Sequence, residues 1–198
     1  MKRLKMIKAL SLLMLGFSLL ACKQGNIGGI LNEDHKVGAI LDSLDGVYVY
    51  YNGSVSNVSG RNTTPDGYNL GLKYQCVEFV KRYYYQALNH KMTDSYGHAK
   101  SFYKAGVEDG KVNATRNLYQ YTNGSKSKPK KGDLLVFDGT LFNEYGHVAI
   151  VSWVGEDELE MIQQNPGPSA SSREKLVLVK EGNKWRIKSG SLLGWLRK

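Results

Sequence analysis

The segment YQCVEFVKRYYYQAL at residues 74–88 decides the fold, because it places a cysteine at the start of a helix. From Gln75 to Leu88 the apolar residues recur at helical spacing with polar residues between them, which predicts an amphipathic helix. The turn-rich run before it, residues 65–71, predicts that Cys76 falls in the first helical turn. The unpaired amides there favour a thiolate and a lowered thiol pKa, and they are suited to hold an oxyanion, with the Gln75 side chain as a second donor.

A second segment, GHVAIVSWV at residues 146–154, opens with a histidine and continues as an apolar strand. Further strands are predicted at residues 134–137, 158–165, 175–180 and 184–188, with 192–196 as a closing segment. Helices followed by an antiparallel sheet predict an α+β fold. Neighbouring strands then bring His147 beside Gln163 or Asn165, and either amide is able to hold the imidazole by its far nitrogen.

Only two cysteines are present, Cys22 and Cys76. If Cys22 is modified, Cys76 is a lone thiol, and an unpaired cysteine in an exported protein suggests a reactive role. The structural alternative is a buried free cysteine that acts as a small hydrophobic residue. A thiol needs a base to become a nucleophile, and His147 is the residue that we expect to supply it.

The N-terminus predicts export. Four basic residues between Met1 and Lys8 precede an apolar run, residues 9–20, that is too short for a comfortable membrane span. The run ends in Leu-Leu-Ala-Cys at residues 19–22, which resembles the lipobox of bacterial lipoproteins, where the cysteine is acylated and the chain is cut before it. We therefore expect a signal peptide at 1–21, a lipidated Cys22 with a tether at 22–45, and one catalytic domain at 46–198, anchored in the bacterial cell envelope.

Charge narrows the set of partners. The chain of 198 residues has a formal net charge of +9, and the predicted signal peptide holds four basic and no acidic residues, so the remainder carries +5. This excess is spread along the chain and never interleaves with aromatic residues as in a nucleic-acid site. Nucleic acid is therefore not expected as a partner. The His and Cys residues do not suggest a metal site either, and no cofactor is expected.

Four ordered motifs together resemble the CHAP domain, the cysteine, histidine-dependent amidohydrolase/peptidase family with a papain-like fold. They are YQCVEFVKRYY at 74–84, PKKGDLLVF at 129–137, GHVAIVSWV at 146–154 and IQQN at 162–165. The resemblance implies that Cys76 is the nucleophile and His147 its general base. The family usually has Glu or Asn as the third member in an E-x-N segment; here Gln163 replaces the Glu and Asn165 matches.

The family resemblance together with the expected anchor predicts hydrolysis of an amide bond in peptidoglycan, with possible control by a regulatory protein partner. The 74–84 segment also resembles the amidase half of glutathionylspermidine synthetase/amidase, so a small peptide–polyamine amide is the enzymatic alternative. Gln163 carries no charge to stabilise an imidazolium, and this motivates a third interpretation, a catalytically inactive lipoprotein that binds the wall.

Overall fold

The computed structural model describes residues 35–167 and 170–198. The predicted signal peptide, Cys22 and the first part of the predicted tether lie outside the described residues. Strand β1 (Ile40–Leu44) falls within the range assigned to the tether and pairs with β2 (Val47–Tyr50). Ordered structure thus begins before residue 46. In the described part of the chain, no helix has the length and apolar character needed to cross a membrane.

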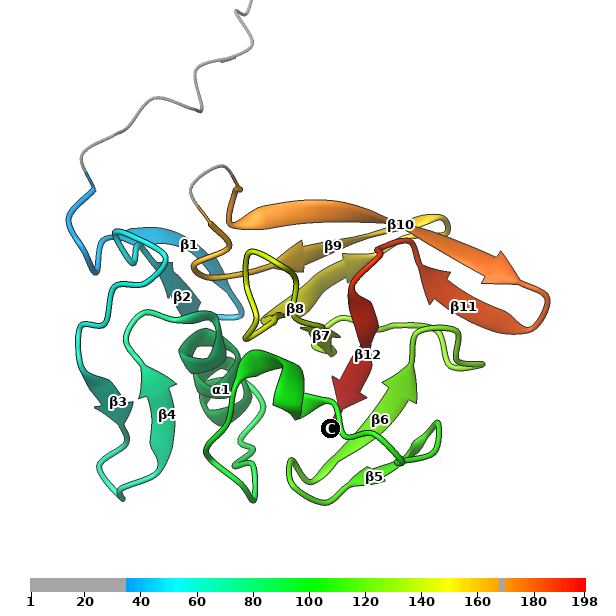
Figure 1. Ribbon diagram of the computed structural model, residues 1–198, viewed down its shortest axis with the longest axis horizontal. Helices are drawn as coiled ribbons and strands as arrows, with labels where there is room; N and C mark the ends of the chain where they lie inside the picture. Colours follow the sequence, from blue (N-terminus) through cyan, green and yellow to red (C-terminus); the bar gives the residue numbers. More distant parts are fainter. Residues whose placement is uncertain (1–34, 168–169) are drawn as a thin grey trace, which may run out of the picture. The chain divides into compact units, whose positions relative to one another are not determined.

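Twelve strands and one α-helix make up the described fold (Figure 1). Two hairpins come first, β1–β2 and then β3 (Arg61–Thr63) with β4 (Asn69–Leu72), and helix α1 (Cys76–Gln86) follows them. A short 3₁₀ turn, η1 (Ala99–Phe102), leads into the rest of the chain. The remaining strands are β5 (Lys111–Asn113), β6 (Leu118–Thr122), β7 (Leu134–Phe137), β8 (His147–Val154), β9 (Glu158–Ile162), β10 (Arg173–Glu181), β11 (Lys184–Ile187) and β12 (Leu192–Arg197).

The strands predicted from residue 134 onward are confirmed, and β7 and β8 have the predicted bounds. The expectation of several N-terminal helices is wrong, because β1 to β4 occupy that part of the chain and α1 is the one α-helix among the described residues. These early strands have three to five residues each and end at glycine turns, so they lack the longer alternation that reveals a strand. The fold is mostly β.

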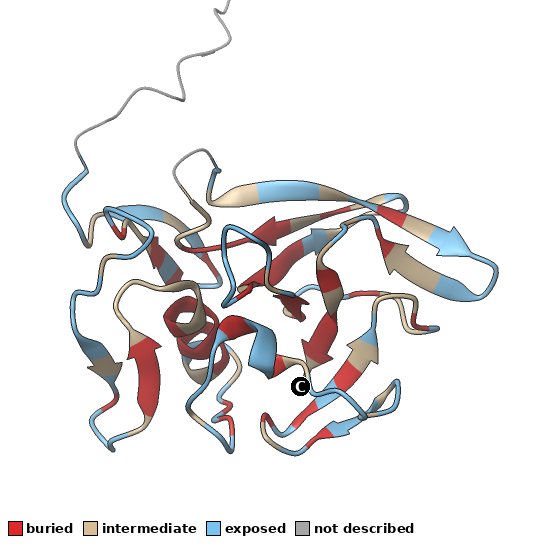
Figure 2. Ribbon diagram, in the orientation of Figure 1, coloured by how far each residue is buried: buried red, intermediate tan, exposed pale blue. Residues whose placement is uncertain are grey.

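The large sheet has eight antiparallel strands in the order β11-β10-β9-β8-β7-β12-β6-β5. Successive residues of β7 and β8 face opposite sides and contribute to two separate core clusters: Leu134, Val136, Val148 and Ile150 pack toward α1, and Leu135, Ala149 and Val151 pack on the other face. The backbone N–H of Trp185 donates to the Ser125 carbonyl at 2.6 Å, which links the β11 end of the sheet to the segment after β6. The sheet therefore curls around its second core, and its central strands are buried on both faces (Figure 2).

Helix α1 is fixed against the centre of the sheet. The hydroxyl of Tyr84, which is fully buried, donates toward the carbonyl oxygens of Gly132 and Leu196 at 3.0 Å each. At the other end of the helix, Gly71 of β4 has φ 128°, and a Cβ there would lie 3.2 Å from the Cα of Glu78. Only glycine allows β4 to approach the first turn of α1 this closely, and that first turn carries Cys76.

Candidate active site

Cys76 and His147 line the same cleft. Cys76 is the first residue of α1, and His147 is the first residue of β8, directly after Gly146. Gly146 has φ 75°, and a Cβ on it would collide with the carbonyl oxygen of Phe137 at 2.5 Å, so the chain can enter β8 at this position only with glycine. The cleft has a volume of about 990 Å³, and Cys76 and His147 are both among the residues that line it.

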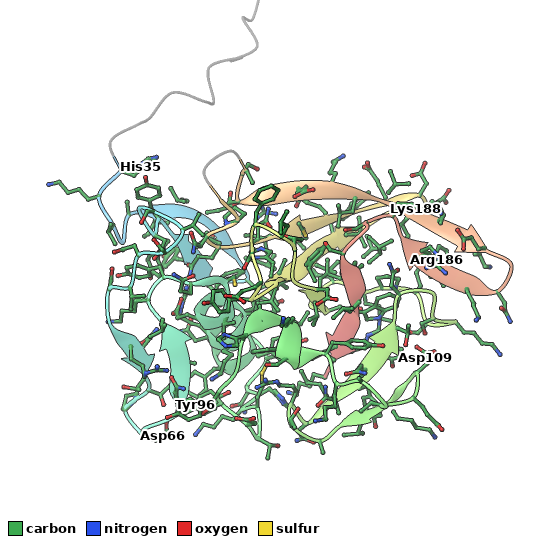
Figure 3. All side chains as sticks on the ribbon, viewed as in Figure 1. His35, Asp66, Tyr96, Asp109, Arg186 and Lys188 are labelled. Atoms are coloured by element: carbon green, nitrogen blue, oxygen red, sulfur yellow. The ribbon has the colours of Figure 1, made fainter. Side chains whose placement is uncertain are left out.

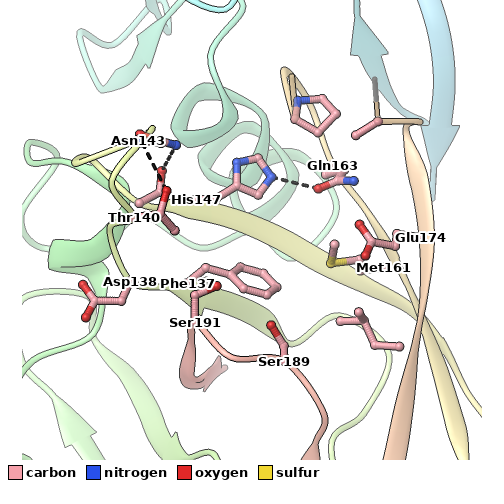
Figure 4. A pocket seen from close by; sticks show the side chains of 14 residues that line it. Phe137, Asp138, Thr140, Asn143, His147, Met161, Gln163, Glu174, Ser189 and Ser191 are labelled. Carbon is pink, nitrogen blue, oxygen red and sulfur yellow. Dashed lines mark hydrogen bonds between the residues drawn. The ribbon is translucent and has the colours of Figure 1, made fainter. Parts of the chain in front are cut away.

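Of the two residues predicted as alternative partners of His147, it is Gln163 that holds the far side of the imidazole (Figure 4). The Oε1 of Gln163 lies 2.9 Å from the Nε2 of His147, and the Nε2 of Gln163 donates to the Ser171 carbonyl at 3.0 Å. Because the amide N–H is committed to a carbonyl, Oε1 faces the histidine and accepts a hydrogen bond from its Nε2–H. This fixes the tautomer, and Nδ1 remains as the basic nitrogen of His147.

Loss of solvent favours the neutral forms of the Cys76 thiol and the His147 imidazole, although both side chains keep partial exposure in the cleft wall. It raises the pKa of the Cys76 thiol to about 11, against a smaller opposite effect of the amides of Val148, Val77 and Cys76 itself. Burial likewise lowers the pKa of His147 to about 4, and the hydrogen bond that His147 donates to Gln163 opposes this only in part. The helix amides therefore act on the thiol as the sequence suggested, but the expected fall in its pKa is wrong because loss of solvent outweighs them.

Gln75 and Asn165 line the cleft in roles that differ from those expected. The side-chain Nε2 of Gln75 donates to the carbonyls of Val55 and Asn57 at 3.1 and 2.8 Å, so neither N–H is free for an oxyanion. Asn165 donates to the Oε1 of Gln75 at 2.8 Å and to the Val55 carbonyl at 2.9 Å, and it makes no hydrogen bond to His147. Both amides thus join the cleft wall to the start of α1.

A buried polar network joins the segment after β9 to α1. Gln164 donates to the carbonyl of Gln75 at 3.0 Å and to Glu78 at 2.9 Å, and Glu78 forms an ion pair with Arg82 at 2.7 Å. Asn62 donates to the same carboxylate at 2.7 Å. Glu78 and Gln164 are completely buried, so the carboxylate is compensated by a cation and two amides rather than by water. The network places Gln163 where it meets His147.

The cleft walls include residues that the sequence did not single out. Val55 and Val58 rise from the loop before β3, and Leu141 and Phe142 form the tip of a tight turn between β7 and β8. Leu141 and Phe142 are 93 % and 95 % exposed. Two adjacent apolar residues in a loop match no sequence motif, so only the structure, which places them beside the cleft, indicates a role in substrate binding. His98 stacks on Tyr145 in the same wall, with ring centroids 4.7 Å apart.

His147 also borders a second, smaller pocket of about 270 Å³ on the side of the ring that faces Gln163 (Figure 4). Met161, Glu174 and Asp138 contribute to its lining. Within residues 35–167 and 170–198, no three His, Cys, Asp or Glu side chains come together in a way that would hold a metal ion.

A cysteine at a helix start and an amide-oriented histidine at the start of a strand of the large antiparallel sheet define a cysteine–histidine type of site. The family model of the CHAP domain matches residues 65–165, just over half of the chain, and the chain belongs to this family. The match covers Cys76, His147, Gln163 and Asn165.

Among curated proteins, the chain is 28 % identical over 132 residues to a trypanothione synthetase of Crithidia fasciculata, which covers 65 % of this chain and 20 % of that protein. It is 27 % identical over 188 residues to the bifunctional glutathionylspermidine synthetase/amidase of Escherichia coli, covering 85 % of this chain and 30 % of that protein. The chain thus spans less than a third of the length of these relatives. Together, the family and the amidase relative support an amidohydrolase activity.

Proposed function

We propose that this protein is a lipid-anchored cysteine amidohydrolase of the bacterial cell envelope that cleaves amide bonds of peptidoglycan. The observation that carries the catalytic part is the hydrogen bond between Nε2 of His147 and Gln163, which leaves Nδ1 as a base in the cleft that Cys76 lines. The envelope part is supported by the lipobox-like residues 19–22, which lie outside the described structure.

The mechanism is acyl transfer to sulfur. When substrate fills the cleft, His147 accepts the thiol proton at Nδ1, and the thiolate of Cys76 attacks the amide carbonyl. The free amides of the first turn of α1, which have no intrahelical acceptor, stabilise the oxyanion. His147 then returns the proton to the leaving amine, and it activates the water that hydrolyses the thioester. Because both groups start neutral, the proton transfer accompanies substrate binding and does not precede it.

Gln163 supports an active site rather than an inactive remnant. Its Nε2 donates to the Ser171 carbonyl, so this position requires a donor on one side and an acceptor on the other. An amide meets both requirements, whereas a carboxylate at the same place would direct an oxygen at the Ser171 carbonyl. The glutamine therefore belongs to a complete hydrogen-bond arrangement, and the neutral third residue is compatible with a proton shuttle that starts from a neutral imidazole.

A small peptide–polyamine amide is the second candidate substrate, and the similarity to the glutathionylspermidine synthetase/amidase supports it. That similarity extends over most of the present chain, including the site. The two substrates place different groups on the nitrogen side of the scissile bond, a stem or cross-bridge peptide or a polyamine. The cleft of about 990 Å³ has room for several residues of either.

Mass spectrometry of reaction products tests both candidates. Full-length protein in detergent is incubated with purified peptidoglycan and, separately, with glutathionylspermidine, and each reaction is repeated with Cys76→Ala. We expect new wall fragments with the wild type only, and their new termini identify the bond that is cut. Cleavage of glutathionylspermidine alone would move the assignment to the second candidate. Identical products from the wild type and Cys76→Ala would refute cysteine catalysis.

A further inference from the structure

Arg61 places a cation in the cleft wall and has no carboxylate partner among residues 35–167 and 170–198. It lies at the start of β3, it is exposed, and its guanidinium donates to the Oδ1 of Asn69 at 3.0 Å. The same guanidinium lies over the ring of Tyr96, 5.8 Å from its centroid. Tyr96, which is labelled in Figure 3, belongs to the segment between α1 and η1. An arginine fixed by an amide and a ring keeps its remaining N–H groups available to an anion.

Two buried cations lie behind this wall. Lys81, which is 1 % exposed, donates to the carbonyl oxygens of Asn69 and Ser95, both of which belong to residues that line the cleft. Arg116, also 1 % exposed, donates to the carbonyls of Asp94 and Tyr96 at 2.5 and 3.1 Å. The Nε of Arg116 has no hydrogen-bond partner. Arg61, Lys81 and Arg116 are thus attached to the same two stretches of chain, β4 and the 94–96 loop.

The positive charge of this region is only partly balanced. None of the three cations forms an ion pair with a carboxylate in the described part of the chain. Asp94 is the acidic residue whose charge reaches Lys81, and its Oδ1 accepts the amide of Tyr96 at 2.9 Å. The pKa of Lys81 falls to about 8, first through burial and then through Arg116 and Arg61, while Asp94 acts in the opposite direction. The other acidic group of the cleft, Glu144, lies in the β7–β8 loop.

We propose that the cleft end formed by Arg61, Asn69 and Tyr96 is a subsite for a free carboxylate of the substrate. This assignment rests on the proposed function, because it specifies the substrate class as an amide whose carbonyl- or amine-side portion carries a carboxylate. Arg61 binds the anion directly, and the buried charges of Lys81 and Arg116 strengthen its field in a region of low dielectric. Val55 and Val58 contribute apolar surface to the same cleft that Arg61 and Cys76 line.

Thiol labelling tests the subsite without requiring hydrolysis. The rate of Cys76 modification is measured with a neutral N-alkylmaleimide and with maleimides that carry a carboxylate on spacers of increasing length. Each ratio of the two rates is divided by the same ratio for glutathione at equal pH. We expect the carboxylated reagent to be favoured by about fivefold at one spacer length, and less so at high salt. Arg61→Gln should remove the preference and Arg61→Lys should keep part of it. Lys126→Gln, an exposed cation outside the cleft, is the matched control.

A second measurement tests the subsite if the Cys76 thiol reacts too slowly to be labelled. Binding of N-acetyl-dialanine and of its C-terminal carboxamide to Cys76→Ala is compared by NMR. Tighter binding of the carboxylate, lost in Cys76→Ala with Arg61→Gln, supports the subsite. Equal binding of the two ligands, or a preference that survives Arg61→Gln, overturns it. A carboxylate preference without any amide hydrolysis would instead leave the subsite in place and refute the proposed function.

Discussion

Replacing Gln163 by Glu is expected to change the proton affinity of His147. The Gln163 oxygen lies 2.9 Å from Nε2, so a carboxylate there would have its charge about 4 Å from that of an imidazolium. At an effective dielectric constant of about 20, two unit charges at this distance attract by about 4 kcal/mol, or about 3 pKa units. Desolvation of the new carboxylate opposes part of this, so we expect the pKa of His147 to rise from about 4 to about 6.

The titration of His147 in protein labelled at histidine is followed by NMR in the wild type, Gln163→Glu and Gln163→Leu. Gln163→Leu removes the acceptor without adding charge, so its His147 pKa should stay low. Gln163→Glu also loses the donor to the Ser171 carbonyl, which costs about 1–3 kcal/mol of stability. At neutral pH its thiol should react with iodoacetamide at least tenfold faster, since a more basic imidazole holds more thiolate. A His147 pKa that rises by less than one unit would refute the reasoning.

Three further predictions concern the network, the pH dependence and the cleft rim. Glu78→Gln leaves Arg82 buried without its counter-charge and should lower the free energy of unfolding, measured in urea, by about 3–5 kcal/mol. The control is Glu158→Gln, which breaks an exposed ion pair with Lys175. Equal effects of the two substitutions would contradict the role of burial. The pKa of His147 is lower in the folded than in the unfolded protein, so the neutral imidazole contributes fully to the free energy of unfolding above pH 6.5. This contribution, up to about 3 kcal/mol, is lost as the pH falls toward 4. His147→Gln should flatten this part of the curve of stability against pH, and an unchanged slope would exclude His147 as its cause. Leu141→Ser with Phe142→Ser should change the unfolding free energy by less than about 0.5 kcal/mol, since both side chains are almost fully exposed. The same double substitution should raise KM for the amide substrate several-fold. An unchanged KM would show that the turn does not contact substrate.

The positions of Cys76 at a helix start and of His147 at a strand start could be predicted because their signals are local. A cysteine at the start of a helical pattern and a histidine at the start of an apolar strand each define a position within one element, and β7 and β8 are regular. The choice between Gln163 and Asn165 could not be made from the sequence, because it depends on the exact end of β9. Beyond Ile162 the chain leaves the strand, and Asn165 adopts a left-handed conformation with φ 55° that turns it toward Gln75.

The environment of α1 was harder to predict. Its pattern indicates a polar face with Glu78, Lys81 and Arg82, and such a face is normally solvated. The structure buries all three, because Asn62, Gln164 and the carbonyls of β4 and the 94–96 loop supply partners from distant parts of the chain. The pKa of the Cys76 thiol was hard to predict for the same reason, because it depends on contacts from distant parts of the chain. The helix start is visible in the sequence, whereas the packing that removes solvent from the sulfur is not.

The raised pKa of the half-buried Cys76 thiol has a consequence for the lifetime of the protein. Peroxides and disulfides react with thiolates, and a pKa raised from 9.0 to about 11 lowers the thiolate fraction at neutral pH by about 100-fold. The resting nucleophile should therefore survive in oxidising surroundings without a dedicated reductant. It becomes vulnerable mainly during turnover, when the proton has moved to His147 and the substrate itself covers the sulfur.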